Sequence, residues 1–194
     1  MSFGSDCGSS EISLTVPSDD NRPRHVGGAC ETIFYQNPKI VAGCIPVWED
    51  KVLLCKRAIE PRHGYWTLPA GFMENAETTF EAAERETREE ANAEVEIEGL
   101  YTVLNIPHTS QVYMIFRSQL RNLDFYPGTE CLERKMLAED EIPWRDLAFP
   151  TIVHTLKFYF EDRKNNDFKL HAGDIVWGDG RAEYFHRRDF EVSP

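Results

Sequence analysis

The sequence predicts an α/β fold, because short apolar runs typical of strands stand on both sides of a charged helix and precede a second helix. The first helix is expected in the second half of residues 71–93, where Thr78 and Glu81 form a capping-box pattern. Alanines and long charged side chains, which favour helices, follow this start. The second helix is expected over residues 149–163, where apolar side chains recur at Ile152, Val153, Leu156, Phe158, Tyr159 and Phe160.

The expected strands lie in four runs rich in β-branched residues. From Pro38, I-V-A-G-C-I-P-V-W and K-V-L-L-C-K-R are separated by Glu49-Asp50, which predicts a hairpin. After the first helix, V-E-I-E-G-L-Y-T-V-L-N-I and S-Q-V-Y-M-I-F-R-S-Q-L predict two further strands. The tail beyond Lys164 is polar but contains Trp177, Tyr184 and Phe185, so the sequence leaves open whether it packs on the domain.

The composition limits the classes of partner. A chain of 194 residues with a net charge of -12 suits one domain plus extensions. The acidic balance argues against nucleic-acid backbones and anionic membranes as partners. Two of the five cysteines, Cys44 and Cys55, sit in strand-like runs and are expected to be reduced core thiols. With no signal-peptide pattern and no bilayer-spanning apolar run, the cytoplasm is the expected compartment.

Three glutamates on the first helix form the strongest candidate site. Glu86, Glu89 and Glu90 stand at i, i+3 and i+4, so their carboxylates share one face. Such like charges destabilise a helix by roughly 0.2–0.5 kcal/mol per pair, and Mg²⁺ or Mn²⁺ would reverse this effect because both take oxygen ligands. The alternative is a solvated helix face held by i, i+4 ion pairs, namely Glu81–Arg85, Glu84–Arg88 and Arg85–Glu89.

The surrounding spacing favours the metal site. Gly71, Glu77, Arg85-Glu86 and Glu89-Glu90 match the Nudix box, G-x5-E-x7-R-E-U-x-E-E-x-G-U, in which U is apolar. Asn92 replaces the second glycine, and asparagine is the next-best residue for a left-handed helix end. Thr87 stands where a larger apolar residue is usual.

This resemblance implies an α/β/α sandwich with a mixed sheet and a Mg²⁺- or Mn²⁺-dependent pyrophosphatase. It assigns the metal to Glu86, Glu89, Glu90 and the Gly71 carbonyl, with Glu89 and Glu90 also counted as catalytic. Glu77 and Arg85 are expected to pair with each other, and direct ligation by them is the alternative.

The first residues resemble the zinc ribbon that precedes many Nudix domains, but half of its ligands are missing. Cys7 and Cys30 remain, whereas Gly4 and Gly27 stand where the first cysteine of each C-x2-C pair would be. A structural zinc ion is normally bound by four ligands, so we expect no zinc in this N-terminal module. The expected organisation is a degenerate ribbon-like module at 1–37, the Nudix domain at 38–163 and a C-terminal extension at 164–194.

Several long segments, among them W-T-L-P-A-G-F-M-E and D-E-I-P-W-R-D-L-A-F, resemble one ribbon-Nudix branch over roughly residues 1–175. That branch includes the plant chloroplast FAD and ADP-ribose pyrophosphatase, which implies FAD or ADP-ribose as substrate, with AMP plus FMN or ribose 5-phosphate as products. The alternatives are an NADH or nucleoside-triphosphate pyrophosphatase, and a non-catalytic ADP-ribose sensor. The resemblance also implies a homodimer.

The residues outside the box that are candidates for catalysis and substrate binding each have a second interpretation. Glu130 or Glu133 would orient the attacking water, or either is a surface charge. Arg57, Trp66 and Tyr113 are candidates for phosphate and adenine contacts, and packing in the core or at the rim is the alternative for Trp66 and Tyr113.

Overall fold

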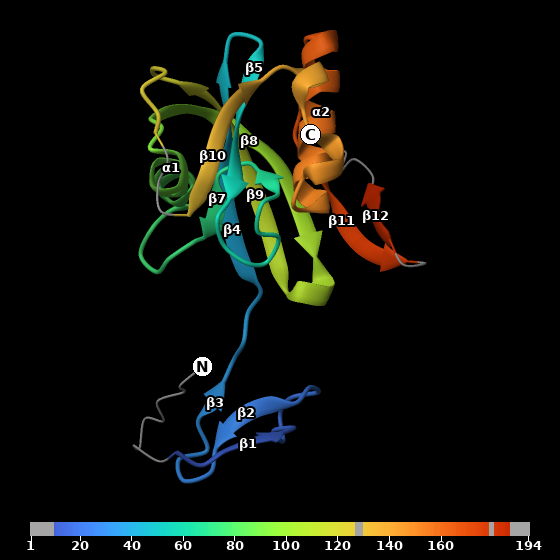
Figure 1. Cartoon of the computed structure of the whole chain (residues 1–194). Helices are drawn as coiled ribbons and strands as arrows, with labels where there is room; N and C mark the ends of the chain where they lie inside the picture. Colours follow the sequence, from blue (N-terminus) through green and yellow to red (C-terminus); the bar gives the residue numbers. More distant parts are fainter. Residues whose placement is uncertain (1–9, 127–129, 179–180, 187–194) are drawn as a thin grey trace, which may run out of the picture. The chain divides into compact units, whose positions relative to one another are not determined.

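The computed structural model describes residues 10–126, 130–178 and 181–186. The chain forms two compact units, Met1–Pro38 and Lys39–Pro194 (Figure 1). In the first unit, β1 (Ile12–Thr15), β2 (Arg24–Gly27) and β3 (Ile33–Phe34) form an antiparallel three-stranded sheet. Cys30 is unpaired, while Gly4 and Cys7 lie outside the described residues.

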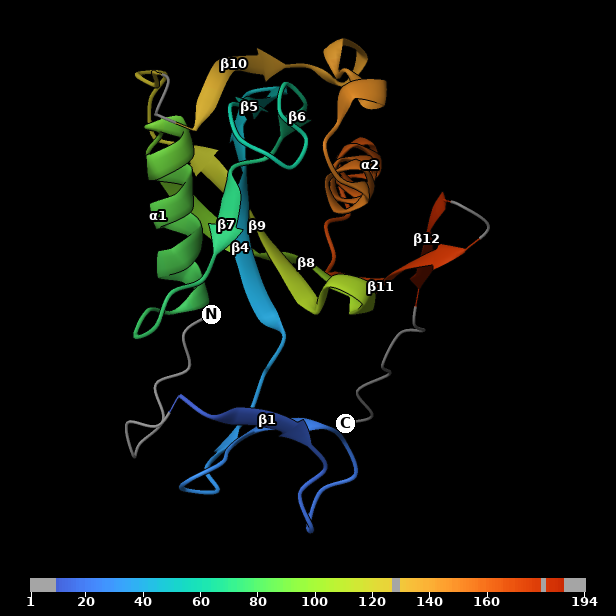
Figure 2. The same cartoon turned by 60° about the horizontal axis from the view of Figure 1, so that its bottom comes forward.

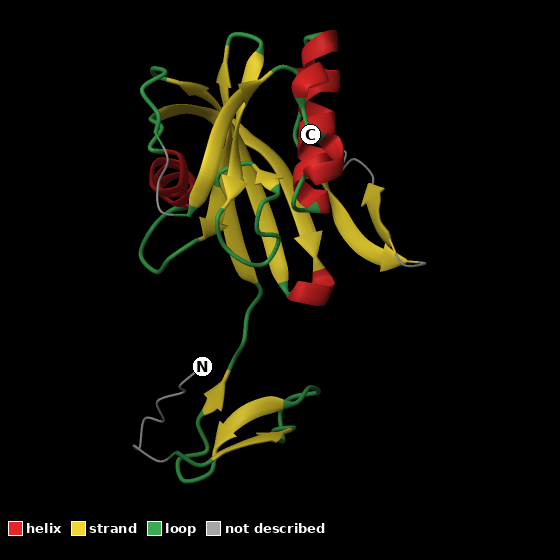
Figure 3. Ribbon diagram, in the orientation of Figure 1, coloured by secondary structure: helices red, strands yellow, loops and turns green. Residues whose placement is uncertain are grey.

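The second unit is built on a nine-stranded sheet (Figure 3). Its main path runs β10-β5-β4-β9-β8-β11-β12, with β6 beside β5 and β7 beside β4. The pairs β4–β9 and β8–β11 are parallel and the other pairs are antiparallel, so the sheet is mixed as predicted. The strands are β4 (Lys39–Trp48), β5 (Lys51–Arg57), β6 (Trp66–Thr67), β7 (Ala70–Phe72), β8 (Val95–Ile106), β9 (Gln111–Leu120), β10 (Cys131–Leu137), β11 (His171–Gly178) and β12 (Arg181–His186).

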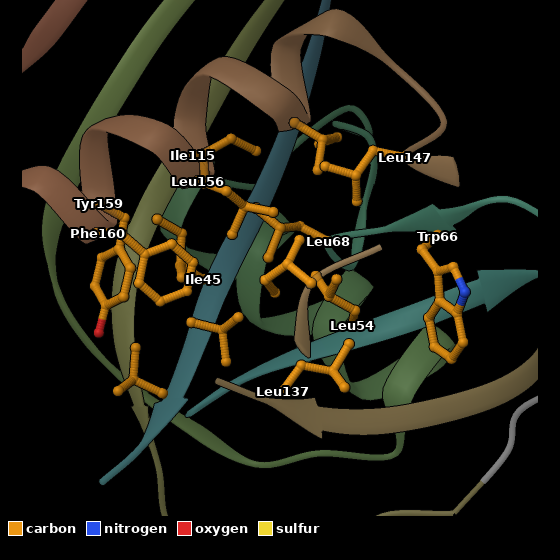
Figure 4. Close-up of a cluster of buried hydrophobic side chains, with 14 of the residues drawn as sticks. Ile45, Leu54, Trp66, Leu68, Ile115, Leu137, Leu147, Leu156, Tyr159 and Phe160 are labelled. Carbon is orange, nitrogen blue, oxygen red and sulfur yellow. The ribbon is translucent and has the colours of Figure 1, made fainter. Parts of the chain in front are cut away.

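Two helices cover the opposite faces of this sheet, α1 (Thr79–Ala91) and α2 (Pro150–Asn165) (Figure 2). Each face has its own buried cluster. Alanines of α1 pack with Cys44, Cys55 and Phe116, whereas α2 packs Leu156 and Phe160 against strand residues such as Ile45 (Figure 4). The α/β/α sandwich is therefore confirmed.

Helix α1 begins and ends as its sequence predicts. The Thr78 hydroxyl accepts a hydrogen bond from the Glu81 N–H (3.2 Å), and the Glu81 carboxylate accepts one from the Thr78 N–H (2.8 Å). Asn92 ends the helix at φ 42°, in the left-handed region that the second box glycine would otherwise occupy. Glu81 is thus a cap of the helix.

The tail after α2 continues the sheet. Strand β11 pairs in parallel with β8, and β12 pairs with β11. A buried hydrogen-bonded group holds this junction: the Asp162 carboxylate of α2 lies 2.7 Å from His171 Nε2 and 2.9 Å from the Tyr101 hydroxyl. None of the helices in the described part of the chain is long and apolar enough to cross a membrane.

Candidate active site

A pocket of about 920 Å³ brings most of the predicted site residues together. The residues predicted from the sequence that line it are Arg57, Gly71, Arg85, Glu86, Glu89, Glu90, Tyr113 and Glu130. The rest of the wall includes residues of β4, of β6 to β9, of the segment after β5, of the η1 turn (Pro107–Thr109) after β8, of the start of α2 and of β11. Acidic side chains from α1 therefore face a largely apolar hollow.

The Glu86 carboxylate approaches Gly71 closely. A β-carbon added to Gly71 would lie 2.3 Å from a carboxylate oxygen of Glu86, which is closer than real β-carbon contacts allow. Strand β7 brings this glycine to the helix, because Gly71 pairs with Ala42 of β4, against which α1 packs. The Gly71 backbone and the Glu86 carboxylate thus lie side by side at the pocket wall.

Arg85 donates hydrogen bonds to four residues around this contact. Its Nε and Nη2 donate to the two carboxylate oxygens of Glu77 (3.0 and 2.7 Å), a bidentate pair. Its Nη1 donates to Glu86 (2.7 Å) and Glu89 (3.2 Å), and its Nη2 also donates to the Phe72 carbonyl (3.1 Å). The expected Glu77–Arg85 pair is present, and Arg85 holds the pKa of Glu77 down at about 2.

Glu90 lies deeper than Glu89, and its charge is costly there. Burial raises the pKa of the Glu90 carboxyl to about 8, the Ala70 N–H opposes this by donating to it (3.1 Å), and the charge of Glu86 adds to the increase. Burial likewise raises the pKa of Glu86, although Arg85 opposes that shift. Two partly buried carboxylates with raised pKa values form an environment that a cation would stabilise.

The donor set fits a hard divalent cation by its chemistry. Glu86, Glu89 and Glu90 supply carboxylate oxygens, and Gly71 supplies a backbone carbonyl next to them. Within the described ranges, no three His, Cys, Asp or Glu side chains already form a group that could hold a metal ion. The reason is visible in the contacts: Arg85 holds the carboxylates of Glu86 and Glu89. A cation entering the pocket would have to take over these two carboxylates, while Glu77 keeps Arg85 in place.

Arg57, Tyr113 and Glu130 surround the glutamates from other elements. Burial raises the pKa of Tyr113, and the positive charge of Arg57 opposes this increase as it does for Glu90. The negative charge of Glu130 adds to the increase in the pKa of Glu86 and Glu90. All three side chains line the same pocket as these carboxylates.

Two predicted site residues lie away from the pocket wall. Trp66 is 7% exposed and packs in the α2-side core, where Figure 4 shows it near Leu54 and Leu68. Its neighbour Thr67 lines the pocket instead. Glu133 lies within β10, pairs with Lys135 at 2.7 Å and approaches Lys56 at 3.9 Å.

Other residues of the pocket were not foreseen. Phe72 and Phe149 line it, as do Ile59 and Ile175. Phe72 directly follows the box glycine, and Phe149 is the first residue of the second predicted helix, so both lie beside features that the sequence predicts. The sequence gave no signal for Ile175, because this residue reaches the pocket only through the pairing of β11 with β8, two strands far apart in the chain.

Known proteins share both units of this chain. A family model described as NUDIX domain matches residues 37–149, and one described as Nudix N-terminal, a zinc-ribbon family, matches residues 3–36. The crystal structure of a NUDIX hydrolase from Nitrosomonas europaea is 56% identical with a TM-score of 0.86, covering 90% of this chain and 99% of that chain. The chain belongs to the Nudix hydrolase family.

Two curated relatives match over shorter stretches. The uncharacterized Nudix hydrolase YvcI of Bacillus subtilis is 30% identical over 112 residues, which cover 55% of this chain and 65% of that protein. The ADP-ribose pyrophosphatase of Methanocaldococcus jannaschii is 36% identical over 74 residues, covering 38% of this chain and 44% of that protein. The match thus spans less than two thirds of each of these relatives.

Proposed function

We propose that this protein is a pyrophosphatase that hydrolyses the diphosphate of ADP-ribose or FAD with Mg²⁺ or Mn²⁺. The products would be AMP plus ribose 5-phosphate or FMN. The observation that carries this proposal is one pocket that holds Glu86, Glu89 and Glu90 beside Gly71. Its volume of about 920 Å³ is near the upper end of the roughly 300–1,000 Å³ usual for small-molecule sites, which suits a dinucleotide-sized substrate.

We assign different roles to the pocket residues according to their charge and position. Glu86, Glu89, Glu90 and the Gly71 carbonyl would hold the cation, which supplies Lewis acidity and lowers the pKa of a bound water. Arg57 offers a guanidinium to the diphosphate, and Tyr113 a hydroxyl beside it. Glu77 and Arg85 position the helix and the loop before it through their bidentate pair.

Glu130 is the residue of this pocket that we assign to the attacking water. It faces the glutamates but has no place in the Arg85 cluster, so its carboxylate is available as a base. Water oxygen would bond to phosphorus, the P–O bond of the anhydride would break, and the water proton would pass to Glu130.

The assay that tests this function is a panel of ADP-ribose, FAD, NADH and nucleoside triphosphates with Mg²⁺ or Mn²⁺, and with EDTA. We expect metal-dependent AMP release from ADP-ribose or FAD. Cleavage of NADH or triphosphates alone would point to the other pyrophosphatase class. Binding of ADP-ribose without any metal-dependent product would point to a sensor.

The proposal also includes the compartment, the partners and the oligomeric state of the enzyme. Cys30, Cys44, Cys55 and Cys131 are unpaired thiols among the described residues, which suits a reducing compartment such as the cytoplasm. A net charge of -12 favours small anionic substrates bridged by cations over nucleic acids or membranes. A homodimer is the proposed assembly.

A further inference from the structure

We infer that the pocket holds two separate ring-binding platforms, Phe72 and Phe149, and that it therefore favours substrates with a planar heterocycle at both ends of the diphosphate. This inference rests on the proposed function and concerns which substrate class the same site selects. Base–aromatic stacking is a strong and sequence-tolerant contact, so two aromatic side chains that line one pocket are a basis for selection.

Phe72 is the first platform. It lines the pocket at the end of β7 and remains 47% exposed, which is unusual for a large aromatic side chain. The Lys39 ammonium lies 4.7 Å from its ring centroid. A ring that keeps one cation beside it and still faces solvent is ready to stack on a heterocycle.

Phe149 is the second platform. It lines the pocket as the residue that caps the start of α2, and the Arg57 guanidinium carbon lies 5.2 Å from its ring centroid. Each of the two phenylalanines is thus paired with its own cation, Lys39 for Phe72 and Arg57 for Phe149.

The two platforms lie beside different residues of the glutamate cluster. The Phe72 carbonyl accepts from Arg85, which also binds Glu86. Phe149 contacts the Arg57 guanidinium through its ring, and Arg57 lines the same pocket as Glu90.

They also belong to different layers of the sandwich. Strand β7 belongs to the sheet, where it pairs with β4, and its Phe72 carbonyl accepts from Arg85 of α1. Phe149 directly precedes α2, the helix on the opposite face of the sheet (Figure 2). A diphosphate held at the glutamates would therefore have one platform toward each of its ends. FAD would use both platforms, whereas ADP-ribose, with one ring, would use one.

The experiment compares kcat/KM for FAD and ADP-ribose in the wild type, Phe72→Ala and Phe149→Ala, with Mg²⁺. One alanine variant should lose roughly tenfold for FAD and less than about twofold for ADP-ribose, while the other loses roughly tenfold for both. Phe72→Tyr and Phe149→Tyr keep a ring and should restore the wild-type ratio. Phe80→Ala is the matched control, because Phe80 is similarly exposed (50%) on α1 but does not line the pocket.

A binding measurement tests the platforms without hydrolysis. Calorimetric titration of FMN into the wild type, with and without saturating AMP in Mg²⁺, should show that AMP leaves FMN binding in place. Displacement of FMN by AMP, or an unchanged FAD to ADP-ribose ratio in both alanine variants, overturns the inference. Independent binding of both nucleotides with no hydrolysis of any substrate would keep the platforms and refute the proposed function.

Discussion

The Glu86 carboxylate lies against the α-carbon of Gly71, so closely that a methyl group there would lie 2.3 Å from one of its oxygens. The atoms that would have to move are the far end of a flexible side chain. A larger residue at 71 should therefore displace the carboxylate without unfolding the protein.

Gly71→Ala should lower kcat/KM at least about tenfold and raise the Mg²⁺ concentration needed for half-maximal activity. The melting temperature should change little, because Glu86 can swing away. Gly99→Ala is the matched control, since a β-carbon on Gly99 meets nothing within 4 Å. Steady-state kinetics over a Mg²⁺ series check the prediction, and unchanged metal dependence in Gly71→Ala would contradict it.

Glu90→Gln should lower kcat by roughly two or more orders of magnitude, a loss of about 2.7 kcal/mol or more in transition-state stabilisation. Folding should not suffer, because the amide removes a charge that burial disfavours. Glu84→Gln, on the same helix but outside the pocket lining, should change kcat little. Equal losses in the two variants would show that the glutamates are an ordinary charged face.

The purified protein should hold no stoichiometric zinc, because Gly4 and Gly27 remove two of the four ribbon ligands. Gly27 lies beside Cys30: a β-carbon added at Gly27 would lie 2.8 Å from the Cys30 sulfur, so a cysteine there requires that sulfur to shift. The double variant Gly4→Cys/Gly27→Cys should then bind about one zinc per chain. Elemental analysis after dialysis checks both statements, and about one zinc in the wild type would refute the first.

The protein should be a dimer in solution. The first unit exposes apolar side chains at Leu14 (65%), Val16 (53%) and Tyr35 (64%), and a second subunit would cover such a surface. Light scattering at micromolar concentration should give twice the chain mass of 22.4 kDa. A monomer mass under these conditions would count against the assembly.

Asp162 should make the protein sensitive to acid. Burial alone would raise its pKa, but hydrogen bonds from His171 and Tyr101 outweigh this and leave the pKa below the ordinary 3.8. The carboxylate therefore adds stability above that ordinary value, and this stability is lost as the pH falls through the lowered folded pKa.

Asp162→Asn should cost about 2 kcal/mol or more at neutral pH and flatten the decline of stability below about pH 4. Asp167→Asn, an exposed neighbour, should behave like the wild type. Thermal melts of both variants from neutral to about pH 2.5 provide the test. A parallel acid decline in Asp162→Asn and the wild type would show that another group controls it.

The residue patterns predicted the local parts of the structure, the family resemblance predicted the layers and the mixed sheet, and neither predicted which strand residues face the pocket. The caps of α1 and the Glu77–Arg85 pair follow from residues close together in the chain. Trp66 illustrates the limit: Trp66 and Thr67 are neighbours on β6, and neighbouring side chains of a strand point to opposite faces. Whether Trp66 or Thr67 enters the pocket thus depends on which face of the sheet each side chain of β6 points to. The local sequence does not determine this orientation.

The parallel pairing of β11 with β8 affects the order in which the molecule can form during synthesis. The ribosome delivers β8 long before β11, and until His171 and its neighbours emerge the outer edge of β8 has no partner strand. An unpaired strand edge invites pairing with other chains. A product of premature termination after α2 would therefore carry every box glutamate and still be prone to aggregate.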